Sequence, residues 1–203
     1  VFVGYGKVKA ALFDHNNSIE AVMDPAGKKY PAKAVIANCS VTALFDKMVP
    51  KKRVPPDFSR QIRERTASLS SFVVWLGLNK KILDIKDYEI DLAQNTDMNE
   101  AGLFSRKDLA DSGIGITLYD NLFKDYSVPG KSTLSIMCLS DFAPWKKFEK
   151  DYFNNQKDAY DREKERIART FIKRVEQRLI PGLSDYIEVM EIGTPLTNMF
   201  YTQ

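Results

Sequence analysis

The run Phe72–Leu78, with the sequence FVVWLGL, constrains the fold of this chain more than any other stretch. β-Branched and aromatic residues fill it, which is typical of a strand. Because it is apolar at neighbouring positions, both faces of that strand would be apolar, and we expect it to lie centrally in a sheet. The same signals predict further strands at residues 88–93, 114–119, 133–139 and 186–192.

A long helix is predicted between the last two of these strands. From residue 147 to residue 179, apolar side chains recur at three- and four-residue spacing, with a break near Asn154–Asn155. Pro181–Gly182 ends the helix. Together these elements predict an α+β fold, in which a mostly antiparallel mixed sheet of about five strands is covered by helices.

The first forty residues predict a separate, smaller sheet. Short apolar strands alternate there with turns rich in Asp, Asn and Gly, as in an antiparallel meander. The strands are expected at residues 7–13, 19–23 and 28–30, with turns at 14–17 and 24–27.

A continuous apolar run, Ala34–Ala37, follows the meander. Runs of this kind are typical of a strand that is buried on both faces. Ser40 is the expected N-cap of a helix over residues 41–48, and a second helix is expected from Pro56 to about Thr66.

The composition excludes several classes of protein. With 203 residues, 44% of them hydrophobic, the chain can form one domain with a small appendage. A formal net charge of +3 does not favour a dedicated nucleic-acid binder. No apolar run reaches the roughly 20 residues of a membrane-spanning helix. Since the sequence starts at Val1 inside a predicted strand and stops at Gln203 without a terminal helix or tail, we expect a piece of a longer protein.

Few residues offer catalytic chemistry of their own. The only histidine, His15, lies in a turn rich in Asn and Asp, where a solvated side chain is expected, so triads and most metal sites are excluded. Cys39 and Cys138 lie in apolar runs and are predicted to be small buried residues of a reduced, cytoplasmic protein. Neither Gly4–Gly6 nor Gly113–Gly115 opens a helix, so neither forms a nucleotide-binding loop.

Basic residues gather between the two predicted N-terminal helices. Three interpretations stay open: a solvated face, contact with an anionic membrane surface, or nucleic acid, the last without an aromatic stacking platform. The residues proposed for peripheral membrane contact are Lys51, Lys52, Arg53, Arg60 and Arg63, with Lys47 and Arg65 nearby.

Aromatic residues occur within the predicted strands. They can either fill a core or line an apolar cavity, and lying together on one sheet face would favour the cavity. The residues concerned are Phe72, Trp75, Tyr88 and Tyr119.

Three segments resemble a known family. Residues 18–40 are similar to the meander and following strand of two-dinucleotide-fold flavoproteins, and their exit, Ala37–Ser40, resembles that of the phytoene desaturase, carotenoid isomerase and retinol saturase branch. Residues 70–79 are similar to the S-x-F-x-x-x-L-G strand of that branch. Residues 191–202 are similar to its E-x-x-T-P-x-T segment, which returns from the substrate domain to the FAD domain.

This resemblance implies a division of the chain into three parts. Residues 1–40 would be the meander and strand of a discontinuous FAD-binding domain, residues 41–192 the substrate domain, and residues 193–203 the return segment. It implies non-covalent FAD in the complete protein and desaturation, saturation or isomerisation of C=C bonds in an apolar polyisoprenoid, carotenoid or retinoid. The flavin carries the redox chemistry, while the protein positions the substrate.

The resemblance also implies site residues. The catalytic residues stay unassigned. Contacts with the cofactor would come from Ala37, Asn38, Thr194, Pro195 and Thr197. The apolar substrate wall would include Phe72, Trp75 and Tyr119.

Two further expectations follow from a chain that lacks the family's glycine-rich nucleotide loop and its C-terminal flavin segment. The piece alone is expected neither to retain FAD nor to turn over substrate, and its exposed domain surface is expected to favour self-association. The alternative is a non-catalytic module that binds lipid or another protein.

Overall fold

The computed structural model describes residues 7–64, 69–93 and 108–202. The chain divides into two compact units, one formed by Val1–Ala67 with Phe200–Gln203 and the other by Ser68–Met199. Each unit is described separately below.

The first unit contains the predicted meander. Its strands β1 (Ala10–Phe13), β2 (Ile19–Met23) and β3 (Lys29–Pro31) pair in sequence order and antiparallel. Asp14 closes the first turn, because its Oδ1 accepts hydrogen bonds of 2.9 Å from the backbone N–H groups of Asn16 and Ser18. Asp14 and its turn therefore behave as the sequence predicts.

The apolar run Ala34–Ala37 is not the buried strand predicted from its composition. It forms no strand, and the side chain of Ile36 is 98% exposed. Cys39 is also exposed, so its predicted burial is wrong, whereas Cys138 is buried as expected. Burial of such a run requires neighbouring strands on both sides, and no described strand pairs with it.

Helical segments complete the first unit. Ser40 caps α1 (Val41–Ala43) by accepting a hydrogen bond from the backbone N–H of Ala43, and the turns continue through η1 (Leu44–Met48). A short 3-10 turn, η2 (Lys51–Arg53), then leads to α2 (Pro56–Glu64). By their contacts these segments belong to the first compact unit, which contains Val1–Ala67. The functional division at residues 40 and 192 that the resemblance implies stays a prediction.

Contacts from Arg53 explain that grouping. Its guanidinium lies 4.7 Å from the ring centroid of Phe13 and donates to the backbone carbonyl of Asp14. Phe45 and Phe58 also pack edge to face, at 5.0 Å between ring centroids. The helical segments therefore pack with the meander and with each other.

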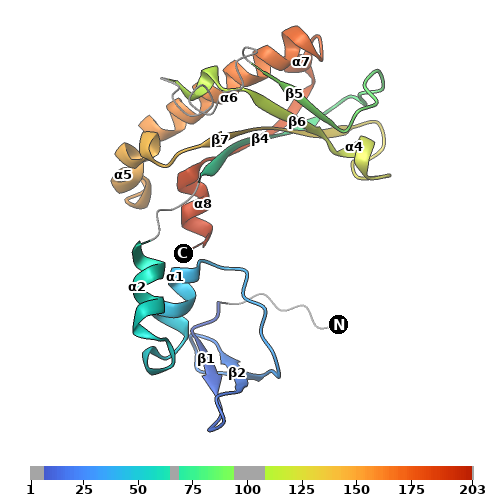
Figure 1. Ribbon diagram of the computed structural model, residues 1–203. Coiled ribbons are helices and arrows are strands. Elements are labelled where there is room, and N and C mark those ends of the chain that lie inside the picture. The colour runs from blue at the N-terminus through green and yellow to red at the C-terminus, as the bar shows by residue number, and fades with distance from the viewer. Residues whose placement is uncertain (1–6, 65–68, 94–107, 203) are drawn as a thin grey trace. The chain divides into compact units, whose positions relative to one another are not determined.

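The second unit contains the five-stranded sheet that the sequence predicts. The strand order is β5-β6-β7-β4-β8, and every neighbouring pair is antiparallel, which confirms the α+β class (Figure 1). β4 lies between two other strands, as its apolar sequence requires. The strands are β4 (Ser70–Leu78), β5 (Glu89–Leu92), β6 (Ile114–Leu118), β7 (Ser132–Ser140) and β8 (Ile187–Gly193).

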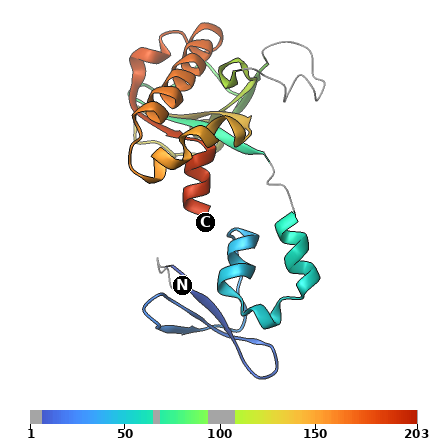
Figure 2. The ribbon, with the colours of Figure 1, turned by 90° about the vertical axis from the view of Figure 1, so that its left-hand side faces the viewer.

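The longest helix, α6 (Asp158–Arg178), covers one face of this sheet (Figures 1 and 2). It follows a break at Asn155, which has a positive φ of 60°. Gly182 makes the turn after α6 with a φ of 75°. Glycine adopts this left-handed conformation easily because it has no Cβ. The remaining segments are η3 (Leu109–Asp111), α4 (Tyr119–Leu122), η4 (Ala143–Phe148), α5 (Glu149–Phe153), α7 (Leu183–Tyr186) and α8 (Pro195–Thr202).

The core lies between the sheet and α6. Along β4, Phe72, Val74 and Leu76 point into it and are fully buried. Phe171 and Val175 of α6 meet them from the helix side and are fully buried as well. Successive strand residues point to opposite faces, so the residues between them lie on the face away from α6.

Candidate functional site

The face of the sheet away from α6 is apolar and partly open. Trp75 of β4, which is 41% exposed, lies on it with Met137 and Leu139 of β7 and Val189 of β8. Met137, Leu139 and Val189 are 44%, 57% and 56% exposed. We call Trp75, Met137, Leu139 and Val189 the open apolar face.

The indole of Trp75 has room on this face because residue 193 is glycine. A Cβ at Gly193 would lie 2.9 Å from Cζ3 and 3.1 Å from Cη2 of Trp75. Gly193 is opposite Val73 in the ladder, one row from Trp75. The neighbouring backbone thus lets the ring lie along the sheet.

Polar groups border the open apolar face on the β6 side. Ser135 is the ladder partner of Trp75, and its Oγ lies 3.2 Å from the hydroxyl of Tyr119. The ring of Tyr119 stacks on that of Tyr126, with ring centroids 5.0 Å apart. The face therefore combines an apolar surface with hydroxyl groups at one side.

The predicted substrate wall is only partly assembled. Trp75 and Tyr119 lie on the same face of the sheet, but Phe72 lies on the other. Phe72 is buried in the core, where its ring lies 5.7 Å from that of Trp145 and 5.8 Å from that of Phe171. Strand alternation explains this, since positions 72 and 75 differ by an odd number of residues.

The return segment is fixed by a buried hydroxyl cluster. The Tyr160 hydroxyl of α6 lies 3.0 Å from Thr194 Oγ1 and 3.1 Å from Thr197 Oγ1. Thr194 Oγ1 also accepts a hydrogen bond from the backbone N–H of Leu196, at the start of α8. Thr194 and Pro195 are buried and Thr197 is half-buried, so a cofactor contact through the Thr194 side chain would require this cluster to open.

The other two predicted cofactor residues, Ala37 and Asn38, lie in the first unit. Both are exposed and belong to no helix or strand. The five contacts with the cofactor stay predictions.

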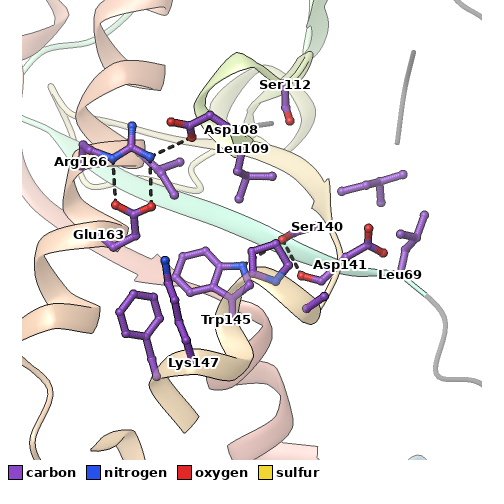
Figure 3. A pocket seen from close by; sticks show the side chains of 15 residues that line it. Leu69, Asp108, Leu109, Ser112, Ser140, Asp141, Trp145, Lys147, Glu163 and Arg166 are labelled. Atoms are coloured by element: carbon purple, nitrogen blue, oxygen red, sulfur yellow. Dashed lines mark hydrogen bonds and ion pairs between the residues drawn. The ribbon is translucent and has the colours of Figure 1, made fainter. Parts of the chain in front are cut away.

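A cavity of about 340 Å³ lies at the end of the sheet where β7 leaves it (Figure 3). Arg166 of α6 donates to Asp108 at 2.8 Å and to Glu163 at 2.9 and 3.1 Å. Trp145 Nε1 donates to Ser140 Oγ at 3.1 Å. Because Arg166 is already neutralised by two carboxylates, we assign this network to the attachment of η3 to α6 rather than to ligand binding.

The same ion pairs shift the ionisation of their members. The hydrogen bonds from Arg166 lower the pKa of Asp108 and that of Glu163 below their ordinary values. The pKa of Arg166 is raised, first by its hydrogen bond with Glu163 and then by that with Asp108. The pair of Glu163 and Arg166 is visible in the sequence as an i,i+3 spacing, but Asp108 is 58 residues from Arg166 and gave no signal.

The basic cluster is partly neutralised within the first unit. Arg63 pairs with Asp46 at 2.8 Å, and this hydrogen bond lowers the pKa of Asp46. Arg60 pairs with Asp57 at 2.9 Å. Membrane contact through this cluster stays a prediction, and Arg65 and Gly4–Gly6 lie outside the described residues.

The described ranges contain neither a metal-binding cluster nor a membrane-spanning helix. Within them, no group of three or more His, Cys, Asp and Glu side chains is arranged to hold a metal ion. No helix in those ranges combines the length and the apolar character needed to cross a bilayer. His15 is exposed in its turn, as predicted.

Similarity to known proteins agrees with the sequence motifs. Prolycopene isomerase of Arabidopsis thaliana is 24% identical over 194 residues, which cover 94% of this chain and 30% of that protein. All-trans-retinol 13,14-reductase of Danio rerio is 24% identical over 181 residues, covering 84% of this chain and 30% of that protein. The resemblance to the carotenoid isomerase and retinol saturase branch is confirmed. No model of a known protein family matches the chain.

The chain spans about 30% of the length of these curated relatives. Among solved structures, an oxidoreductase from Methanosarcina mazei aligns with 94% of this chain and 37% of its own, at 8% identity and a TM-score of 0.49.

Of the residues that line the open apolar face, the sequence had singled out Trp75 alone. Met137, Leu139 and Val189 follow from strand alternation once the covered face is known.

Proposed function

We propose that this chain is the substrate-facing part of an FAD-dependent oxidoreductase that acts on C=C bonds of an apolar polyisoprenoid, carotenoid or retinoid. The open apolar face is the observation that carries the proposal. It offers an indole, a thioether and aliphatic side chains, with the exposed carboxylate of Glu191, the ladder partner of Trp75 on β8, beside them. A mainly apolar surface with few polar groups suits binding of a polyene.

The names of the relatives support the reaction class. One is called an isomerase of prolycopene and another a 13,14-reductase of all-trans-retinol, and both names describe changes at C=C bonds of long polyenes. In this proposal FAD supplies the electron or hydride chemistry. Trp75, Met137 and the neighbouring apolar residues hold the substrate and exclude water.

The absorption spectrum of the full-length protein tests the cofactor. We expect flavin bands, released as FAD on denaturation, whereas residues 1–203 alone are expected to be colourless. A full-length protein that is purified without flavin, and that does not take up added FAD, would contradict the proposal and favour the lipid-binding or protein-interaction module.

A substitution tests the role of the face. Trp75→Ser in the full-length protein should raise KM for a polyene substrate such as retinol or prolycopene by about tenfold, because an indole side chain contributes more than 1.4 kcal/mol of apolar contact. Leu83→Ser, at an exposed apolar residue outside the face, is the matched control. Equal KM values for the two variants would show that this face does not bind substrate.

A further inference from the structure

The connection between β6 and β7, residues 119–131, exposes an unusual number of large apolar side chains. Phe123 and Tyr126 are each 52% exposed and Val128 is 62% exposed, and Leu122 is exposed beside them. Soluble proteins rarely expose several large apolar side chains in one loop unless that loop binds a partner or a membrane.

These side chains are held in place rather than loosely displayed. The ring of Tyr126 stacks between those of Tyr119 and Phe123, with centroid separations of 5.0 and 6.1 Å. Asp120 fixes the loop base, since its carboxylate accepts hydrogen bonds from the backbone N–H groups of Ser127 and Thr133 at 3.0 and 2.8 Å. The apolar residues are therefore presented at low entropic cost to a partner.

Lysines surround the same loop. Lys81, Lys124 and Lys131 line a hollow together with Tyr126, Val128 and the turn at Pro129–Gly130. Lys131 pairs with Glu188, and the carboxylate of Asp120 is used by the loop itself. Among the described residues, Lys81 and Lys124 make no ion pair, and Asp125 is the one other acidic residue that lines the hollow.

We propose that this β6–β7 connection docks on the surface of an anionic lipid bilayer. Phe123, Tyr126 and Val128 would enter the interfacial layer, where aromatic rings are favoured, while Lys81 and Lys124 would meet lipid phosphates. Lysines are depleted in the cores of protein–protein interfaces, so exposed aromatic side chains beside lysines without ion pairs suit an anionic bilayer surface better than a protein partner.

The β6–β7 connection lies next to the open apolar face. Figure 1 shows α4 at the end of the sheet away from α5 and α8. Tyr119 belongs to both regions, because it stacks on Tyr126 in the loop and reaches Ser135 beside Trp75. If the proposed function holds, an apolar substrate would pass from the bilayer along the loop to the open apolar face.

Sedimentation of the full-length protein with lipid vesicles tests the docking without any measurement of activity. We expect binding to vesicles of phosphatidylcholine mixed with phosphatidylglycerol, and weaker binding to phosphatidylcholine alone. Lys81→Gln combined with Lys124→Gln should weaken binding to the anionic vesicles about thirtyfold. Phe123→Ser combined with Val128→Ser should weaken binding to both kinds of vesicle at least about tenfold.

Matched controls come from elsewhere in the chain. Lys150→Gln with Lys173→Gln removes the same charge from exposed lysines of α5 and α6. Phe153→Ser with Val41→Ser removes a phenylalanine and a valine that are 45% and 52% exposed. Both controls should bind within about threefold of the unchanged protein. Absence of vesicle binding, unchanged binding by the loop variants, or loss of binding in the Lys150 and Lys173 control would each overturn the proposal. Because flavin content is measured separately, either proposal can fail without the other.

Discussion

At the scale of single residues, the hydroxyl of Tyr160 connects two segments that are far apart in the sequence. It lies within 3.1 Å of the hydroxyl oxygens of both Thr194 and Thr197, and both Tyr160 and Thr194 are buried. A buried hydroxyl without a partner costs about 1–3 kcal/mol, so the three groups stabilise the fold mainly by satisfying one another.

Tyr160→Phe should therefore lower the free energy of unfolding by about 1–3 kcal/mol, because Thr194 and Thr197 lose the partner they share. Urea unfolding followed by circular dichroism measures this change. Tyr201→Phe removes the same atom from a side chain that is 78% exposed and should change the stability by less than about 0.5 kcal/mol. Equal effects of the two substitutions would show that the cluster contributes nothing to stability.

At the scale of elements, the ion pairs of Arg166 attach η3 to α6. The folded-state pKa values of Asp108 and Glu163 are lowered by the hydrogen bonds from Arg166. A lowered pKa contributes stability that is present above the unfolded-state pKa, near 4, and that is lost as the pH falls through the folded-state value. All three side chains are about a third or more exposed, so solvent screening limits the contribution to about 1 kcal/mol.

We expect Arg166→Met to reduce stability at neutral pH by about 1 kcal/mol and to flatten the loss of stability below pH ~5. Urea midpoints measured from neutral to acidic pH test this. Arg169→Met removes a longer and more exposed ion pair with Glu165. It should leave the loss of stability at acidic pH unchanged. If the stability of the unchanged protein and that of Arg166→Met fall equally steeply at acidic pH, the Arg166 ion pairs do not contribute to stability.

The elements also show which parts of the structure local sequence can predict. Turns and caps depend on neighbouring residues, so Asp14, Ser40 and Gly182 were correctly interpreted from their positions. The strand predicted at Ala34–Ala37 failed because burial depends on strands that pair with it from elsewhere. Alternation likewise separates Phe72 from Trp75, but only the placement of α6 decides which of them is covered.

At the scale of the whole molecule, the large core belongs to one unit. The side chains buried between the sheet and the helices come from residues 72–196, all within Ser68–Met199. The first unit contributes none of them and makes its own contacts, such as those of Arg53 with Phe13 and Asp14. A domain needs its own core to fold alone. We therefore expect the second unit, but not the first, to fold when it is expressed alone.

Residues 68–202 expressed alone should therefore fold, because they retain the five-stranded sheet, its helices and every member of its core. Unfolding in urea, followed by circular dichroism and by the fluorescence of buried Trp145, should be cooperative, with a midpoint close to that of residues 1–203. Residues 1–67 alone should unfold without a cooperative transition, since the few buried apolar residues of that unit cannot offset the loss of chain entropy. A fragment 68–202 that lacks a cooperative transition would show that the first unit is needed to complete the core.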